Sequence, residues 1–150
     1  DSHDVSRFLS LCGGDTASYR LAILFMMCFV GMPTIFYGDE LGVQGIREEE
    51  YRAPMPWETG SLSLLAFFRK AIAMRHALAP LRAGDFRVLS AETGSRVFCF
   101  RRCIGEDMVT VTVNAGDAPA DIPVSTEKTY WAEGLEDSTL SSGGFVITCH

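Results

Sequence analysis

The sequence predicts two structural units in tandem: an α/β unit over residues 1–83 and a small antiparallel all-β unit over residues 84–150. Bulky apolar residues recur at helical spacing before residues 81–85 and flank one short β-branched run, whereas later runs alternate with period two. Hydrophobic residues make up 47% and charged residues 21% of the 150 residues, which is the balance of a folded globular chain.

The first helix is expected over residues 16–30. Asp15 or Thr16 can cap its N-terminus, Gly31 follows as a terminator, and Pro33 lies just beyond. Its apolar run, LAILFMMCFV, is about half as long as the roughly 20 residues that span a bilayer. We therefore expect a buried helix and no membrane partner.

A short strand, a long loop and a second helix should follow. The β-branched and aromatic run TIFYG at residues 34–38 is typical of a buried strand. Residues 41–57 contain two glycines, two prolines and the charge run REEE, so we expect a loop of functional importance. Ser61 can then open a helix over residues 61–78, which Pro80 should stop.

From residue 86 onward the pattern is that of short antiparallel strands. The runs FRVLS, RVFCFRR and MVTVTVN alternate, and turn residues separate them. In the third run the valines should face inward while Thr110 and Thr112 face outward. Weaker strands are expected at residues 122–124, 129–132 and 145–148, which together predict an antiparallel β-sandwich.

Several classes of function are excluded by composition and motif content. A net charge of -6 with only 13 Lys and Arg residues argues against a nucleic-acid partner. The chain has no P-loop, no G-x-G-x-x-G and no metal-binding histidine spacing, so we expect no cofactor and no metal ligand. Its five cysteines form no C-x-x-C pair and no secretory leader is visible, which predicts reduced thiols and a cytoplasmic location.

Few polar residues suggest chemistry. Asp39 and Glu40 close the predicted strand, where α/β proteins often place functional groups, but either residue could instead brace the loop that follows. Adjacent strand residues point to opposite faces, so these two carboxylates cannot flank one bond as a catalytic pair. Ser2, His3 and Asp4 are likewise too close in sequence to form a catalytic triad.

Four stretches resemble one family. SHDVSRF at residues 2–8 resembles the motif after the seventh barrel strand of the α-amylase superfamily, glycoside hydrolase family 13, in the form of its neopullulanase, cyclomaltodextrinase and maltogenic amylase branch. GMPTIFYGDE at residues 31–40 resembles the eighth-strand segment of the same family, and RAPMPW at residues 52–57 resembles the stretch that follows that strand. GGFVI at residues 143–147 resembles the end of the family's C-terminal β-sandwich, called domain C.

The resemblance implies a specific fold. Residues 1–83 would be the last helices and strand of a (β/α)8 TIM barrel, and residues 84–150 would be domain C. A complete barrel needs about 200 residues or more, so this chain would hold only its end. We therefore expect the natural start to lie upstream of Asp1.

The resemblance also implies roles for six residues. Asp4 matches the third catalytic carboxylate, which binds substrate hydroxyls and favours the oxocarbenium-like transition state. His3 matches the histidine that hydrogen-bonds sugar hydroxyls in the same subsite. The other four are expected to support the site, with two arginines orienting acidic neighbours and two acidic residues bracing the rim: Arg7, Arg52, Asp39 and Glu40.

The implied activity is retaining hydrolysis of α-1,4-glucosidic bonds, with α-1,6 bonds as a second candidate, in α-glucans or maltooligosaccharides. The family's nucleophile and general acid would lie upstream of Asp1, so the isolated chain should be inactive, and any family calcium site would also draw on upstream segments. Homo-oligomerisation through uncovered apolar faces, or order mainly over residues 62–150, is a further expectation. Two alternatives stay open: a non-catalytic carbohydrate-binding or interaction module, and a catalytically silent homologue serving as a transport or scaffold subunit.

Overall fold

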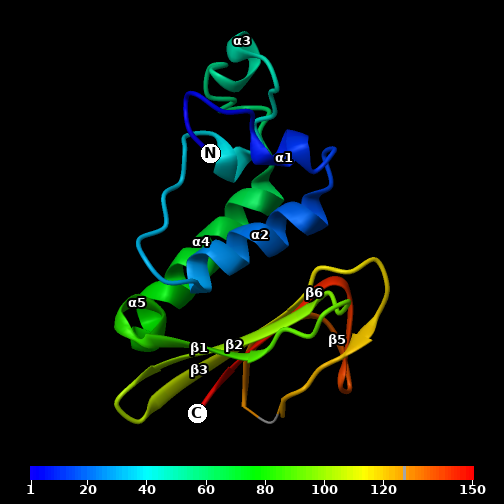
Figure 1. Ribbon diagram of the computed structural model, residues 1–150. Coiled ribbons are helices and arrows are strands. Elements are labelled where there is room, and N and C mark those ends of the chain that lie inside the picture. The colour runs from blue at the N-terminus through cyan, green and yellow to red at the C-terminus, as the bar shows by residue number, and fades with distance from the viewer. Residues whose placement is uncertain (127) are drawn as a thin grey trace.

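Helices lie on one face of an antiparallel sheet in the computed structural model, which describes residues 1–126 and 128–150 (Figure 1). The elements in chain order are α1 (Phe8–Leu11), α2 (Thr16–Cys28), η1 (Asp39–Leu41), α3 (Glu48–Tyr51), α4 (Leu62–Ala77), α5 (Ala79–Ala83), β1 (Asp85–Ser90), β2 (Val97–Ile104), β3 (Asp107–Asn114), β4 (Ala120–Asp121), β5 (Thr129–Glu136) and β6 (Thr139–Cys149).

The two long helices begin at side-chain caps and lie within two residues of their predicted bounds. The Asp15 carboxylate accepts hydrogen bonds from the second and third amides of α2, and the Ser61 hydroxyl accepts one from the Leu64 amide at the start of α4. As predicted, α4 ends just before Pro80, at Ala77, and a separate short helix, α5, follows. Pro80 itself lies in the first turn of α5, where its missing N–H costs no hydrogen bond. None of the described helices is long and apolar enough to cross a membrane.

The predicted strand at residues 34–38 is wrong in this structure. Residues 32–36 have no regular secondary structure and lead into a turn and η1. Within the described chain every paired strand belongs to the sheet that begins at Asp85, so no neighbouring strand is available to residues 34–38. A strand needs the backbone of a neighbour to complete its hydrogen bonds, and the run therefore stays irregular. The predicted loop over residues 41–57 also contains a short helix, α3.

The six strands of the described residues form one antiparallel sheet with the order β1-β2-β3-β6-β4. The remaining strand, β5, also pairs with β6. Val111 lies opposite Phe100 of β2 and Ile147 of β6. The strands predicted at residues 129–132 and 145–148 are confirmed as parts of β5 and β6. The one predicted at residues 122–124 is wrong, because the pairing with β6 involves Ala120 and Asp121 instead.

Both faces of β3 are buried, so the prediction that its threonines face solvent is also wrong. Thr110 and Thr112 are 2% and 0% exposed. Residues 115–126 pass along the face of the sheet opposite the helices (Figure 1). Asn114 fixes this connection, because its side-chain amide donates to the carbonyls of Ala118 and Leu140. The Thr112 hydroxyl is satisfied within the sheet by a hydrogen bond to the Cys99 sulfur, 3.2 Å away.

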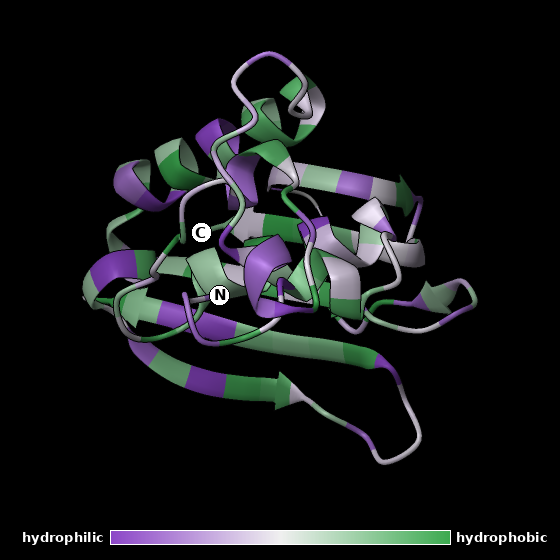
Figure 2. Ribbon diagram, turned by 90° about the horizontal axis from the view of Figure 1, so that it is seen from above, coloured by the Kyte–Doolittle hydropathy of each residue, from purple (hydrophilic) through white to green (hydrophobic). Residues whose placement is uncertain are grey.

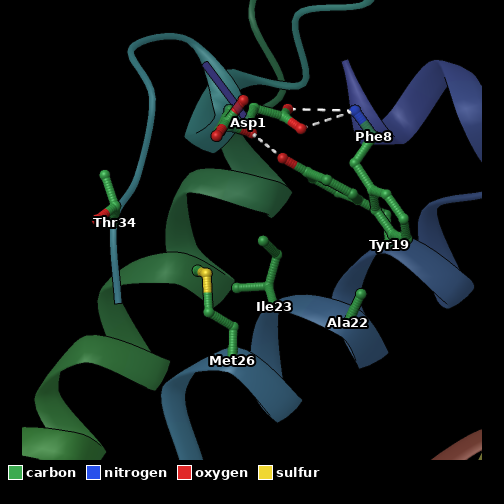
Figure 3. Close-up of a pocket in the computed structure, with 8 residues that line it drawn as sticks. Asp1, Phe8, Tyr19, Ala22, Ile23, Met26 and Thr34 are labelled. Atoms are coloured by element: carbon green, nitrogen blue, oxygen red, sulfur yellow. Dashed lines mark hydrogen bonds between the residues drawn. The ribbon is translucent and has the colours of Figure 1, made fainter. Parts of the chain in front are cut away.

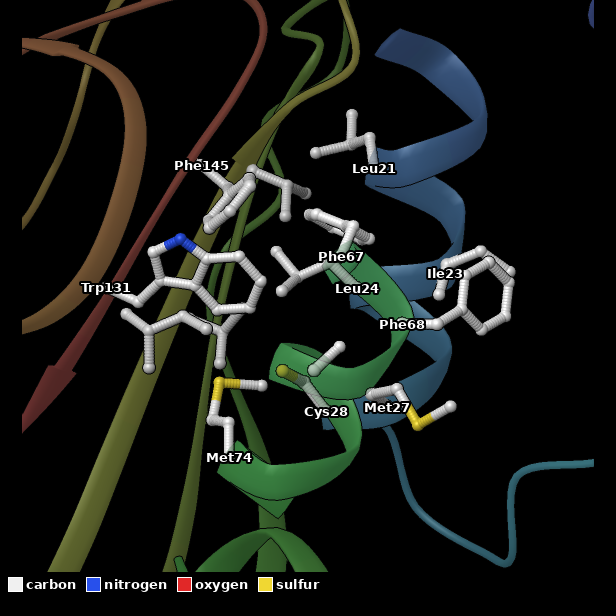
Figure 4. Close-up of a cluster of buried hydrophobic side chains, with 14 of the residues drawn as sticks. Leu21, Ile23, Leu24, Met27, Cys28, Phe67, Phe68, Met74, Trp131 and Phe145 are labelled. Carbon is white, nitrogen blue, oxygen red and sulfur yellow. The ribbon is translucent and has the colours of Figure 1, made fainter. Parts of the chain in front are cut away.

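The main core lies between the helices and the sheet (Figure 4). Aromatic contacts cross it, including Phe67 with Trp131 at 5.2 Å and Phe25 with Phe100 at 5.7 Å between ring centroids. Each fully buried side chain of this size contributes about 1.5–3 kcal/mol. Hydrophobic and hydrophilic residues are interleaved along helices and strands (Figure 2), so apolar side chains can gather between the layers while polar ones face water.

A buried arginine joins the two layers. Arg102 of β2 is 2% exposed, and its guanidinium donates to four backbone carbonyls. The acceptors lie at the C-terminus of α2, in α5 and at the turn into β1: Cys28, Leu81, Gly84 and Asp85.

A second arginine completes the end of α2. Arg75 of α4 donates to the carbonyls of Met27 and Phe29 through Nη1 and to that of Gly31 through Nη2. These carbonyls lie at or just beyond the C-terminus of α2, where the helix itself supplies no donors and a positive charge is favoured. Arg75 and Arg102 therefore secure the helical layer to itself and to the sheet.

Candidate functional site

The N-terminal segment lies at the end of the helical layer farthest from the sheet, beside α1, η1 and α3 (Figure 1). In it the His3 Nε2 and an Asp4 carboxylate oxygen are 3.0 Å apart. The two side chains are 69% and 65% exposed. This exposed histidine–carboxylate pair can both donate and accept hydrogen bonds, which suits it to a ligand rich in hydroxyl groups.

Arg52 holds this pair from the loop that contains α3. Its Nε donates to the His3 carbonyl at 2.9 Å, and its Nη2 lies 3.4 Å from the second Asp4 oxygen. The remaining Nη1 pairs with Glu48 at 2.6 Å, one helical turn earlier. The structure thus brings Arg52 to two adjacent residues, His3 and Asp4, that lie far from it in the sequence, and the acidic neighbours of Arg52 are Asp4 and Glu48.

Arg7 is buried behind the pair and has no exposed surface. Its Nη1 donates to an Asp39 carboxylate oxygen at 2.9 Å and to the Tyr37 carbonyl at 2.8 Å. Its Nε donates to the Tyr51 carbonyl at 3.0 Å, and the guanidinium lies 4.2 Å from the centre of the Phe36 ring. Arg7 therefore connects the N-terminal segment to two separate loops.

The Asp39 carboxylate is only 4% exposed and is committed to structural partners. Its second oxygen accepts the Phe36 amide at 3.1 Å, while the Tyr19 hydroxyl donates to its backbone carbonyl. Burial raises the pKa of Asp39, and the hydrogen bond from Arg7 acts in the opposite direction. Asp39 thus braces the corner before η1.

A small cavity of about 200 Å³ lies between α2 and this corner (Figure 3). Asp1 lines it, but its carboxylate accepts the Phe8 amide at 3.0 Å. Glu40 lines a separate hollow, next to Leu65 and Arg69 of α4. One of its oxygens is buried there and has no hydrogen-bond partner within the described chain. The structure therefore does not bring Glu40 to the His3–Asp4 pair.

Asp4 faces a shallow open hollow of about 790 Å³. Half-exposed or exposed apolar side chains share its lining, including Val5, Leu11 and Ile46. A carboxylate among apolar side chains can hold a sugar by its hydroxyl groups while the apolar face of the ring rests against hydrocarbon. Among residues 1–126 and 128–150, no group of three or more His, Cys, Asp and Glu side chains is placed to hold a metal ion.

Sequence reasoning missed two contributors to the site. Glu48 was read only as part of a charge run, although its spacing of four residues from Arg52 is a helical ion-pair signal. The Tyr51 carbonyl, which accepts from Arg7, left no signal because a backbone acceptor does not depend on the side chain.

Comparisons with known proteins show the family to which the chain belongs. The family model described as "Alpha amylase, catalytic domain" matches residues 1–66. Neopullulanase 2 of Thermoactinomyces vulgaris is 40% identical over 116 residues, which cover 76% of this chain and 20% of that protein. A cyclomaltodextrinase of a Bacillus species is 38% identical over 116 residues, covering 76% and 21%. The chain thus spans about a fifth of the length of these relatives.

Solved structures cover the whole chain. The native form of the Nostoc punctiforme debranching enzyme superimposes with a TM-score of 0.87 and 28% identity over 100% of this chain and 34% of that one. A cyclomaltodextrinase does so with a TM-score of 0.79 and 33% identity over 100% and 27%. The predicted fold class, the end of a (β/α)8 barrel followed by an antiparallel β domain, is therefore confirmed. By both sequence and fold, the chain belongs to the α-amylase family, alongside neopullulanases and cyclomaltodextrinases.

Proposed function

We propose that the chain is the C-terminal part of a retaining glycoside hydrolase that cleaves α-1,4-glucosidic bonds, and α-1,6 bonds as a second substrate class, in α-glucans or maltooligosaccharides. Residues 1–83 would end its barrel and residues 84–150 would form domain C. The observation that carries the proposal is the His3–Asp4 pair, held by Arg52 at an open hollow. The names of the relatives, which include neopullulanase, cyclomaltodextrinase and amylopullulanase, support an α-glucan substrate.

In this proposal Asp4 stabilises the transition state electrostatically. Positive charge develops on the sugar ring as the glucosidic bond breaks, and hydrogen bonds from ring hydroxyls to a fixed carboxylate strengthen at that moment. Asp4 is suited to this because His3 and Arg52 each contact one of its two oxygens and limit its rotation. His3 would donate to a neighbouring hydroxyl of the same sugar.

The nucleophile and the general acid are proposed to come from upstream of Asp1. Retaining hydrolysis needs two further carboxyl groups about 5.5 Å apart across the scissile bond. Besides Asp4, the open hollow is lined by the carboxylate of Asp1, which is already bound to the Phe8 amide. The 150 residues alone are therefore expected to show no hydrolysis. Self-association through uncovered apolar faces and a cytoplasmic location belong to the same proposal.

The test compares this chain with the longest open reading frame that contains it. The longer protein should hydrolyse short maltooligosaccharides, and proton NMR should show that the first product keeps the α-anomeric configuration. The 150-residue chain should show no turnover under the same conditions. An inverted product, or a longer protein that binds maltooligosaccharides without cleaving them, would contradict the proposal. The second result would favour the carbohydrate-binding alternative.

A further inference from the structure

The N-terminal segment that carries His3 and Asp4 is attached to residues 45–52, which we call the clasp. Several hydrogen bonds join the N-terminal segment to the clasp. The Ser6 hydroxyl donates to the Ile46 carbonyl at 3.0 Å, and the Arg7 amide donates to the Gly45 carbonyl at 2.8 Å. The Gly45 amide in turn donates to the Ser10 hydroxyl at 2.8 Å. Arg52, at the end of the clasp, reaches His3 and Asp4.

The clasp is closely packed on itself. A Cβ atom added to Gly45 would clash with the backbone of Glu50 and Tyr51, so only glycine allows the two ends of the clasp to approach this closely. Glu50 accepts hydrogen bonds from the amides of Ile46 and Arg47, which fixes the first turn of α3. The clasp therefore acts as one unit whose placement sets the position of Arg52.

Arg7 is the side chain that places this unit. It donates to the Tyr51 carbonyl inside the clasp and also to Tyr37 and Asp39 in the corner before η1. The corner is itself anchored to α2 through the hydrogen bond from the Tyr19 hydroxyl. Arg7 thus links the clasp, through this corner, to the helical layer.

The chemistry of the contact requires a guanidinium. The planar fork of Arg7 reaches three acceptors in different directions, and one face of it lies against the Phe36 ring. A lysine would keep the charge opposite Asp39 and could reach the Tyr37 carbonyl from the same nitrogen, as Nη1 does, but it has no donor in the place of Nε for the Tyr51 carbonyl. The contacts of Arg7 therefore depend on the shape of the guanidinium as well as on its positive charge.

We propose that Arg7, together with its partner Asp39, is a positioning residue for the proposed hydrolysis: it holds the clasp, and through Arg52 the clasp holds His3 and Asp4. This inference rests on the proposed function but concerns residues that do not touch the substrate. Because Asp4 acts mainly in the transition state, a looser clasp should lower kcat while the KM changes little.

The experiment uses two variants in the longer reading frame. Arg7→Lys keeps the charge but removes the fork, and it should lower kcat about tenfold or more with less than about a twofold change in KM. The double variant Arg7→Met with Asp39→Leu replaces the buried ion pair with apolar groups of similar size, which proteins often tolerate without loss of stability. It should fold, with a Tm lowered by the unpaired Tyr37 and Tyr51 carbonyls and Phe36 amide, and show the same loss of kcat. Arg87→Lys, an exposed arginine on β1, is the matched control.

A second readout does not depend on catalysis. In the 150-residue chain, the {¹H}-¹⁵N heteronuclear NOE of the His3 and Asp4 amides should fall in both variants and remain unchanged in Arg87→Lys. A folded Arg7→Lys or double variant with wild-type kcat and unchanged NOE values would overturn the inference. If Asp4→Asn left turnover unchanged, the proposed function would fail, and the NOE comparison would still decide whether Arg7 orders the pair.

Discussion

Replacing Arg102 with methionine should destabilise the protein more than any loss of surface charge. Arg102 lies at the junction of the two layers, where its guanidinium donates to four backbone carbonyls. Burial and the neighbouring Arg75 both lower the pKa of Arg102, which shows that the charge is costly to keep there. The site tolerates it because each of the three guanidinium nitrogens donates to at least one carbonyl oxygen.

The magnitude follows from the acceptors. Two of the four, the carbonyls of Cys28 and Leu81, are buried, and each unsatisfied buried carbonyl costs about 1–3 kcal/mol. Removal of the buried charge offsets part of this cost, so we expect a net loss of about 2–4 kcal/mol in the free energy of unfolding. For a chain of this length such a loss lowers the Tm by about 5–15 °C.

The assay is thermal and urea unfolding followed by circular dichroism. Arg102→Lys, with one nitrogen in place of three, should recover less than half of the lost free energy. Arg87→Met on β1 should change it by less than about 0.5 kcal/mol, because its side chain is exposed. If Arg102→Met unfolded at the wild-type temperature, Arg102 would not be the link between the layers, and this reasoning would be refuted.

Two further predictions concern the clasp and the turn into the sheet. Amide hydrogen bonds from Ile46 and Arg47 lower the pKa of Glu50 to about 2. The stability that the ionised Glu50 gives to the clasp is therefore complete above about pH 4.5 and is lost as the pH falls toward 2. An NMR titration of the Glu50 carboxyl with a midpoint above about pH 4 would contradict this. Gly84→Ala would place a Cβ 2.6 Å from the Cys103 carbonyl and should cost about 1–3 kcal/mol, whereas an unchanged urea midpoint would show that the contact relaxes freely.

The elements that depend on local sequence could be predicted, and those that depend on distant partners could not. The caps Asp15 and Ser61 marked the starts of α2 and α4, because a cap acts on amides two or three residues away. The run at residues 34–38 has a strand-like composition, but a strand also needs a neighbour, and its backbone finds none among the described strands. Thr112 alternates with valine as a solvent-facing residue would, yet it is fully buried and its hydroxyl bonds the Cys99 sulfur on the neighbouring strand.

The same distinction applies to the site. Two stretches that resemble the family implied roles for His3, Asp4, Arg7 and Arg52. The structure places Arg52 against His3 and Asp4, and Arg7 against the neighbouring Tyr51. The partners of Arg7 could not be predicted, because they lie 30 or more residues away and two of them are backbone carbonyls. The burial of Arg102 could not be predicted either, because an arginine in an alternating strand ordinarily faces water.

Asp4 is proposed to stabilise the transition state of α-glucoside hydrolysis, and kcat/KM of Asp4→Asn in the longer protein on a short maltooligosaccharide tests this role. Asparagine keeps the size of the side chain but loses the negative charge, so kcat/KM should fall about a hundredfold or more at an unchanged Tm. Asp107→Asn, at the exposed first residue of β3, is the matched control and should retain full activity. An Asp4→Asn enzyme as active as this control would contradict the account.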